Sequence, residues 1–401
     1  MSSSLWMERS VSPRPVPLGL VVAALLAAAA LGLATFLRWD AFRHASVFGL
    51  WNLFDWHDIH VYFLSSGWVA GQGTLYREVP SEYPLLANLL FAAVRLVSGL
   101  VPLGSDYDRF AWTWMLAGLA LYLWTLHRLA TRYPRPALLL WLTPSALHFS
   151  LYRFDVFAVV PALLAVEALA GGRLRRAALL LGLVTALKGY ALFLLPAFLY
   201  HAWARRGARE AALAGAVYLA PFALGNLVTL AFSGTDGLLY AYRFHATRTF
   251  NGESTWDAAA YALGPAVRDA VGRVHGLPFA LQALGALLAL AFRPRTHEAL
   301  MRAFLFATAV FTGASVFYSP QFVLWLVPFV AEWTTPLASW LVVAFSWVTF
   351  VYFPVAYFRR AHHPGLFRAA VVLTAAVRTA VAVAAPFARP APAHATPAGA
   401  P

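Results

Sequence analysis

The chain has 401 residues, of which 61% are hydrophobic and 12% are charged, and its mean hydropathy is +0.66. This composition excludes a water-soluble globular domain, because so little polar surface cannot cover so much apolar volume. The formal net charge of +13 would suggest nucleic-acid binding in a soluble protein, but the arginines cluster between apolar runs, where they orient a membrane protein. Cysteine is absent, which excludes disulfides and thiolate metal sites.

Apolar runs long enough to cross a bilayer recur along the chain from Val16 onward. Because lipid offers the backbone no hydrogen bonds, each run must satisfy its own backbone groups as a helix. We therefore expect an all-α, polytopic transmembrane bundle that forms one domain over residues 1–384. About twelve spans are predicted, at roughly 16–37, 109–127, 136–151, 155–171, 174–187, 189–204, 211–231, 276–292, 299–316, 321–334, 337–355 and 365–384.

Four short segments are dense in arginine: 128–135, 173–176, 205–209 and 293–302. The positive-inside rule places them, and both termini, in the cytoplasm. Two long segments, 39–108 and 233–275, then become outer loops, and the helix expected at 84–103 lies in the outer interface instead of crossing. The Pro/Ala-rich stretch 385–401 is predicted to be disordered.

Two carboxylates, Asp55 and Asp58, lie three residues apart near the start of the first outer loop. On a helix, Asp58 and Tyr62 would share one face. A carboxylate here can act as a general base for an acceptor hydroxyl, or the Asp-x-x-Asp pair could bind a divalent cation through oxygen ligands. Asp55 equally suits a helix N-cap. Further along, Pro84 suits the first turn of a helix, whose N-terminus Glu82 would favour electrostatically.

Several charged residues fall near the predicted membrane boundaries. Lys188 is the only lysine of the chain, and either a donor phosphate or snorkelling to the interface would stabilise its ammonium. Asp155 follows Arg153 closely and suits an ion pair or an N-cap, whereas Glu167 has no assignable partner.

The second outer loop carries Arg243, His245 and Arg248. These side chains offer the donors that a phosphate needs, and the alternative is a basic loop that faces solvent or lipid headgroups.

Seven motifs occur in a characteristic order. They are Asp58-Ile-His-Val-Tyr62, Gly71 with Tyr76-Arg77, Glu82-Tyr83-Pro84, Phe154-Asp155, Ala186-Leu-Lys-Gly-Tyr190, Phe244-His-Ala-Thr-Arg248 with Glu253-Ser254, and Ser319-Pro-Gln-Phe-Val-Leu-Trp-Leu-Val-Pro328. This order resembles the GT-C superfamily, specifically the family 87 membrane glycosyltransferases that include phosphatidylinositol-mannoside mannosyltransferases. The sequence departs from that pattern at Leu85 and at 189–191, where the family often has proline.

The resemblance implies a GT-C fold, a polyprenyl-phosphate sugar donor, inversion at the anomeric carbon, and Asp58 as the catalytic base with Glu82 assisting or orienting it. The expected activity is transfer of a hexose, mannose first, to a lipid or polysaccharide hydroxyl on the outer face of a bacterial plasma membrane. With the arguments above, we expect Lys188, Arg243, His245 and Arg248 to bind the donor phosphate. Residues expected to contact substrate are Asp55, Tyr62, Tyr83, Asp155, Tyr190, Glu253 and Gln321.

Two other functions stay open at this point. A lipid-carrier flippase or small-molecule transporter would use the same polar residues, but it predicts inverted repeats that the sequence does not display. The third interpretation is an enzyme of the same fold that moves a different group, or a partner subunit that has lost activity. The intact Asp58 and Glu82 argue against the latter. The sequence contains no glycine-rich phosphate loop and no zinc-ligand spacing, so a nucleotide-sugar donor is disfavoured and no cofactor is required, with a divalent cation left open.

Overall fold

The computed structural model describes residues 57–102, 104–133, 137–274, 276–332 and 336–387. Within these ranges the protein is all-helical, with one isolated β-bridge between Leu75 and Val79, so the predicted fold class is confirmed. The predicted first span 16–37 and the candidate residue Asp55 lie outside the described residues.

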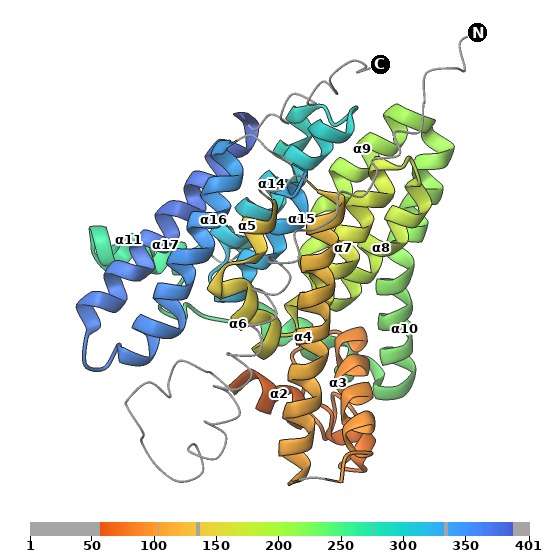
Figure 1. The fold of residues 1–401 in the computed structure, drawn as a ribbon, viewed down its shortest axis with the longest axis vertical. Helices are drawn as coiled ribbons and strands as arrows, with labels where there is room; N and C mark the ends of the chain where they lie inside the picture. The colour runs from red at the N-terminus through yellow and green to blue at the C-terminus, as the bar shows by residue number, and fades with distance from the viewer. Residues whose placement is uncertain (1–56, 103, 134–136, 275, 333–335, 388–401) are drawn as a thin grey trace, which may run out of the picture.

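The first half of the bundle contains two long helices and several short ones (Figure 1). In chain order the elements are α2 (His57–Ser65), η2 (Gly67–Ala70), α3 (Leu85–Ser98), α4 (Asp106–Arg132), α5 (Ala137–Trp141), α6 (Pro144–Tyr152), α7 (Asp155–Ala170), α8 (Leu174–Leu187), η3 (Gly189–Leu194), α9 (Leu195–Arg206) and α10 (Ala208–Ala246).

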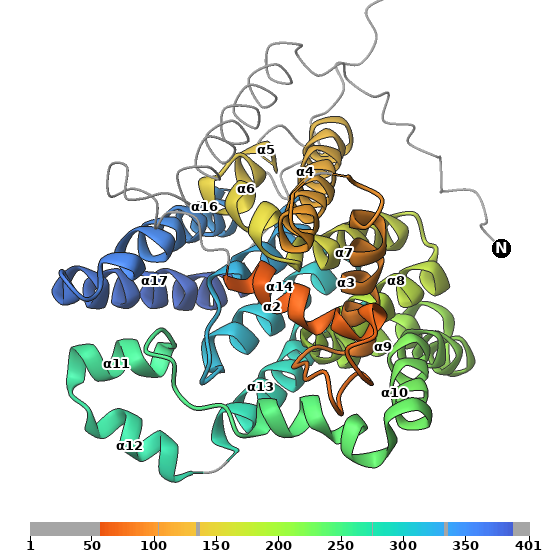
Figure 2. The same ribbon diagram turned by 90° about the horizontal axis from the view of Figure 1, so that it is seen from below.

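The second half begins with two peripheral helices and ends with the antiparallel pair α16 and α17. Its elements are α11 (Thr255–Leu263), α12 (Ala266–Arg273), α13 (Leu277–Leu288), η4 (Ala289–Phe292), α14 (His297–Ala314), η5 (Pro320–Leu326), α15 (Val327–Val330), α16 (Pro336–Phe350), the π-helical turn η6 (Val351–Ala356), η7 (Tyr357–Arg359), α17 (Pro364–Ala384) and η8 (Ala385–Phe387). Seen from below, α2 crosses the end of the bundle, while α11 and α12 lie at its edge (Figure 2).

Three helical stretches of the described chain are long and apolar enough to cross a membrane: Ala208–Ala246, Leu337–Arg359 and Pro364–Phe387. The number rises to five if each of two bent helix pairs counts as one span, and one of these pairs joins α6 to α7 through a bend of 114°. The protein is therefore a membrane protein, and the figure of about twelve spans stays a prediction. Helix α3 has only 14 residues, about 21 Å of helix, which is too short to cross by itself.

The helix bounds differ from the expected ones in three places. The predicted span 136–151 is interrupted, because Thr143 caps α6 and Pro144 opens it. The segment 233–275, expected as an outer loop with interfacial helices, is largely helical: α10 continues to Ala246 past a bend at Gly234, whose φ of 70° interrupts the helical backbone, and α11 and α12 follow. Residues 385–387 form a 3-10 turn instead of a disordered tail.

The antiparallel hairpin of α7 and α8 positions the charged residues described below. The turn at Gly171 and Gly172 reverses the chain, and Gly172 has a φ of 68°, which favours glycine. Helices of 16 and 14 residues then return Lys188, which follows α8, to the level of Asp155, the first residue of α7. The arginines at 173–176 consequently lie at the far end of the hairpin, about 24 Å along α7.

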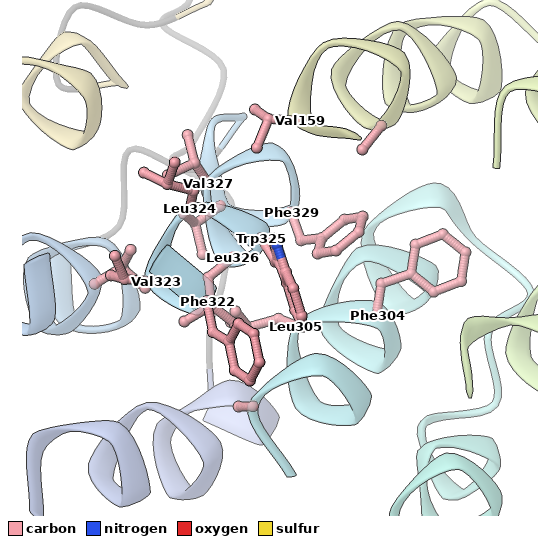
Figure 3. Close-up of a cluster of buried hydrophobic side chains, with 14 of the residues drawn as sticks. Val159, Phe304, Leu305, Phe322, Val323, Leu324, Trp325, Leu326, Val327 and Phe329 are labelled. Atoms are coloured by element: carbon pink, nitrogen blue, oxygen red, sulfur yellow. The ribbon is translucent and has the colours of Figure 1, made fainter. Parts of the chain in front are cut away.

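The centre of the bundle is filled by η5 and α15, whose residues are all buried (Figure 3). Phe322, Trp325 and Phe329 pack there against α7 and α14. A second, smaller cluster joins α2, α3, α4 and the α6–α7 bend through aromatic residues that include Tyr62 and Trp114. Residues of both clusters contact the charged residues described below, Trp325 from the first and Phe154 from the second.

Candidate functional site

The first acid–cation pair closes the α7–α8 hairpin. Asp155 is fully buried, and its Oδ1 lies 3.4 Å from Lys188 Nζ and accepts a hydrogen bond of 2.7 Å from Trp325 Nε1. Its Oδ2 has no hydrogen-bond partner. Asp155 therefore does not form the expected ion pair with Arg153, nor is it an N-cap, since Phe154 occupies that position. The side chain of Lys188 is only 16% exposed, and its ammonium pairs with a buried carboxylate. This position contradicts simple snorkelling, in which the ammonium would lie in water.

The second pair joins α2 to the α6–α7 bend. Asp58 forms a salt bridge with Arg153, and Tyr62, one turn later, donates a hydrogen bond of 3.3 Å to Asp58 Oδ2. The predicted shared face of Asp58 and Tyr62 is thus confirmed. Arg153 is only 6% exposed at its side chain, and sequence reasoning missed it as a site residue. The signal was available, because an arginine at the edge of an apolar run requires a carboxylate partner.

The third pair joins the first outer segment to the residues that follow α10. Arg248 lies 2.5 Å from Glu82 Oε2, and its guanidinium stacks 3.9 Å from the ring centroid of Phe317. His245 Nε2 lies 2.9 Å from the backbone oxygen of Glu82. Glu82 is thus held by two residues far away in the sequence, and it does more than favour the N-terminus of α3.

Arg243 does not join this group. Its side chain is 62% exposed and pairs with Asp236, itself 90% exposed. Arg243 and His245 are two residues apart, about half a turn of helix, so their side chains leave α10 on different faces and only His245 reaches the site.

A hydrogen-bond network fixes the segment that carries Glu82. The hydroxyl of Tyr76 donates to the backbone oxygen of Tyr83 at 2.7 Å and accepts from Asn88 Nδ2 at 3.0 Å. Burial raises the pKa of the Tyr76 hydroxyl, so it remains a donor at neutral pH. Asn88 also donates to the backbone oxygens of Tyr83 and Pro84, which satisfies carbonyls that precede α3.

Aromatic rings surround Lys188. Its ammonium lies 3.9 Å from the ring centroid of Phe154, 5.9 Å from that of Tyr83 and 5.7 Å from that of Trp325. Tyr190 stacks on Trp325 at 4.1 Å with nearly parallel rings. Such rings stabilise a cation through their π faces and exclude water from it.

The three pairs form one charged cluster, which we call the carboxylate–cation cluster: Asp58, Arg153, Glu82, Arg248, Asp155 and Lys188. Lys188 interacts electrostatically with Glu82 and Arg248 as well as with Asp155. The rings of Tyr62, Tyr83 and Phe154 contact one another edge to face between the pairs. The positive and negative formal charges balance, so an entering anion meets cations that are already engaged.

Two further predicted residues lie away from this cluster. Glu253 accepts a hydrogen bond from Tyr352. Gln321 is 4% exposed in η5, and its Oε1 has no hydrogen-bond partner.

Glu167, which the sequence left without a partner, forms a salt bridge with Arg128 across α4 and α7.

No metal centre is found among the described residues, in the sense that no three His, Asp or Glu side chains gather closely enough to hold an ion. Asp55 lies outside them, so the Asp-x-x-Asp cation site stays a prediction. The cluster contains no nucleophile held by a base, and its chemistry is that of carboxylates and fixed cations.

Fold and site together define an all-helical membrane protein with a water-poor cluster of paired carboxylates and cations at one end. The model of Glycosyltransferase family 87 matches residues 82–317, more than half of the chain, and the protein belongs to this family. It is therefore a glycosyltransferase, which uses a sugar donor and an acceptor. Asp58 and Tyr62 precede the matched segment. Neither the curated proteins nor the solved structures contain a match to this chain.

Proposed function

We propose that the protein transfers a hexosyl residue, mannose in the first instance, from a polyprenyl-phosphate donor to a hydroxyl of a lipid or polysaccharide acceptor. Transfer takes place on the outer face of a bacterial plasma membrane, with inversion at the anomeric carbon and with both termini in the cytoplasm. The architecture is of GT-C type, similar to phosphatidylinositol-mannoside mannosyltransferases, and no cofactor is needed.

One observation carries this proposal: the convergence of three carboxylate–cation pairs from distant parts of the chain in a half-buried cluster. A phosphate leaving group needs cations, and an acceptor hydroxyl needs a base. Both are supplied within one cluster. The arginine-rich turn after α7 lies at the opposite end of the hairpin, which supports an outward-facing site under the positive-inside rule.

The proposed reaction is a single displacement. Asp58 accepts the proton of the acceptor hydroxyl as that oxygen bonds to the anomeric carbon, and the bond from this carbon to the phosphate oxygen breaks. The electron pair leaves with the polyprenyl phosphate, whose added negative charge is stabilised by Lys188 and Arg248. Attack opposite to the leaving group inverts the configuration.

Arg153 has a defined part in this sequence of events. Its guanidinium and the hydroxyl of Tyr62 both contact Oδ2 of Asp58 and orient this carboxylate in the resting state. Once Asp58 takes up a proton, its attraction for Arg153 falls. Arg153 is then available to the phosphate that gains charge in the same step.

The test compares Asp58→Asn with Asp236→Asn, a matched substitution at an exposed carboxylate. With a lipid-linked sugar as donor in detergent, Asp58→Asn should lower kcat by about 100-fold or more, because the general base is lost. Asp236→Asn should retain nearly full turnover. Normal turnover of a well-folded Asp58→Asn variant would contradict the assignment of the base.

The same assay addresses the donor and the class of reaction. Polyprenyl-phosphate sugar should support transfer and a nucleotide sugar should not, and NMR of the product should show the inverted anomer. Product formation in detergent, where no compartments exist, also excludes a transporter that only moves its substrate.

A further inference from the structure

Arg378 is a fully buried cation in the middle of a helix that is long and apolar enough to span a membrane. It belongs to α17 and is 1% exposed. Its Nη2 donates to Thr255 Oγ1 at 2.6 Å, and its guanidinium stacks 3.9 Å from the ring centroid of Tyr318. Its Nε and Nη1 have no hydrogen-bond partner, and within the described ranges no carboxylate pairs with it. A charge in such a helix is costly, and where it persists it usually has a function.

Other unpaired polar groups surround this guanidinium. The buried hydroxyl of Tyr318 lies close to the guanidinium and to the buried hydroxyl of Thr349, from α16, and neither hydroxyl makes a hydrogen bond of normal length and angle. Buried polar groups in native proteins are nearly always hydrogen-bonded. The unpaired N–H groups of Arg378 and these hydroxyls are donors that an anion with several oxygens would satisfy.

A row of aromatic rings connects Arg378 with the carboxylate–cation cluster. Trp325, whose ring centroid lies 5.7 Å from Lys188 Nζ, stacks on Phe322 at 4.1 Å (Figure 3). Phe322 in turn meets Tyr318 edge to face at 5.7 Å, and the guanidinium of Arg378 stacks on the Tyr318 ring. Two cations thus stand at the two ends of a row of three rings, one paired with a carboxylate and one without.

We propose that Arg378 is the centre of a second anion-binding subsite, separate from the cluster at Lys188, that takes the phosphate group of a lipid substrate. The inference rests on the proposed use of lipid-linked phosphate. The planar guanidinium donates to two phosphate oxygens at once, and the hydroxyls of Tyr318 and Thr349 add donors to the same anion. The source of the phosphate is either a prenyl chain or a glycerolipid.

The segment at the start of α11 covers this subsite. Asn251 bonds to the backbone oxygen of Tyr318 at 2.7 Å, Glu253 accepts from Tyr352, and Trp256 Nε1 donates to the backbone oxygen of Ala314 at 2.9 Å. A phosphate at Arg378 displaces the hydroxyl of Thr255 and loosens this cover. Binding should therefore increase hydrogen exchange in residues 252–258 while it protects α17.

The experiment measures binding of farnesyl phosphate and of a short-chain phosphatidic acid to the full-length protein in detergent, with farnesol as the uncharged reference. Arg378→Gln should weaken binding of one phosphate probe about tenfold or more, and Arg378→Lys should weaken it less. The matched control is Arg368→Gln, at an exposed arginine of the same helix, which should change neither affinity. The probe that loses affinity identifies the source of the phosphate.

Unchanged affinity for both probes in a folded Arg378→Gln variant would overturn the proposal and leave Arg378 as a structural tether of α11. A tether predicts instead that Arg378→Gln and Thr255→Val lower thermal stability together and leave binding intact. Because the readout is phosphate binding, it is independent of sugar transfer. If the wild-type protein transfers no sugar but binds a phosphate probe in a way that depends on Arg378, the proposed function is refuted and this subsite is retained.

Discussion

Replacement of Asp155 by asparagine measures how much the buried ion pair with Lys188 contributes to the free energy of unfolding. The asparagine side-chain oxygen can still accept from Trp325, so the substitution removes mainly the charge. Two unit charges 3.4 Å apart attract by about 5 kcal/mol at an effective dielectric constant of about 20, before desolvation is subtracted. Loss of one partner of such a buried pair leaves an uncompensated charge and costs about 3–5 kcal/mol. We expect Asp155→Asn to lower the free energy of unfolding by that amount.

The double variant Asp155→Asn with Lys188→Met supplies the control. It removes both charges, so it should recover most of the loss seen in each single variant, with a coupling energy of about 2–3 kcal/mol. Reversible unfolding in mixed micelles, followed by tryptophan fluorescence, measures each free energy, and Trp325, stacked at the site, is one of the 15 tryptophans that contribute to the signal. Additive single effects, or a cost below about 1 kcal/mol for Asp155→Asn, would refute the reasoning that this pair is desolvated and coupled.

Two further predictions rest on neighbouring features. Gly182→Ala places a methyl group against the backbone oxygen of Tyr218, where α8 meets α10, and should lower the free energy of unfolding by about 1–3 kcal/mol. Gly313→Ala, with open space at its Cβ, should be neutral or stabilising. Equal melting temperatures of the two variants would contradict this prediction. Arg248→Gln should raise KM for the lipid-linked donor about tenfold, because a charged contact to phosphate is lost, while Arg243→Gln should not; equal effects in steady-state kinetics would remove Arg248 from the site.

The all-helical class followed from composition and from the length of the apolar runs, since lipid permits few other structures. The bounds of α8 were predicted to the residue. The bends between helices were not predicted, because a run such as 136–151 has the same hydropathy whether it forms one helix or two. Thr143 before Pro144 contained the missing information, as a cap and a first-turn proline.

For the candidate site, the sequence indicated which residues take part better than it indicated which residues pair with each other. Residue type and order pointed to Asp58, Glu82, Lys188 and Arg248, and all four belong to the cluster. The partner of each could not be inferred, since a salt bridge between residues about 95 or 166 positions apart depends on how helices pack. Arg153 was missed because its neighbour Asp155 offered a nearer partner in the sequence than Asp58.

The balance of charge in the cluster offers a reason why, in the proposed reaction, the donor would be cleaved only when an acceptor is bound. Three carboxylates engage three cations, so a phosphodiester that enters adds a negative charge that no unused cation of the cluster offsets. In the proposed reaction, Lys188 and Arg248 stabilise part of the charge that the leaving phosphate gains, and Asp58, once neutral, releases Arg153 to offset the rest. Proton transfer from the acceptor and departure of the phosphate are thus coupled through Arg153. A donor without an acceptor hydroxyl near Asp58 lacks this relief, which opposes its cleavage.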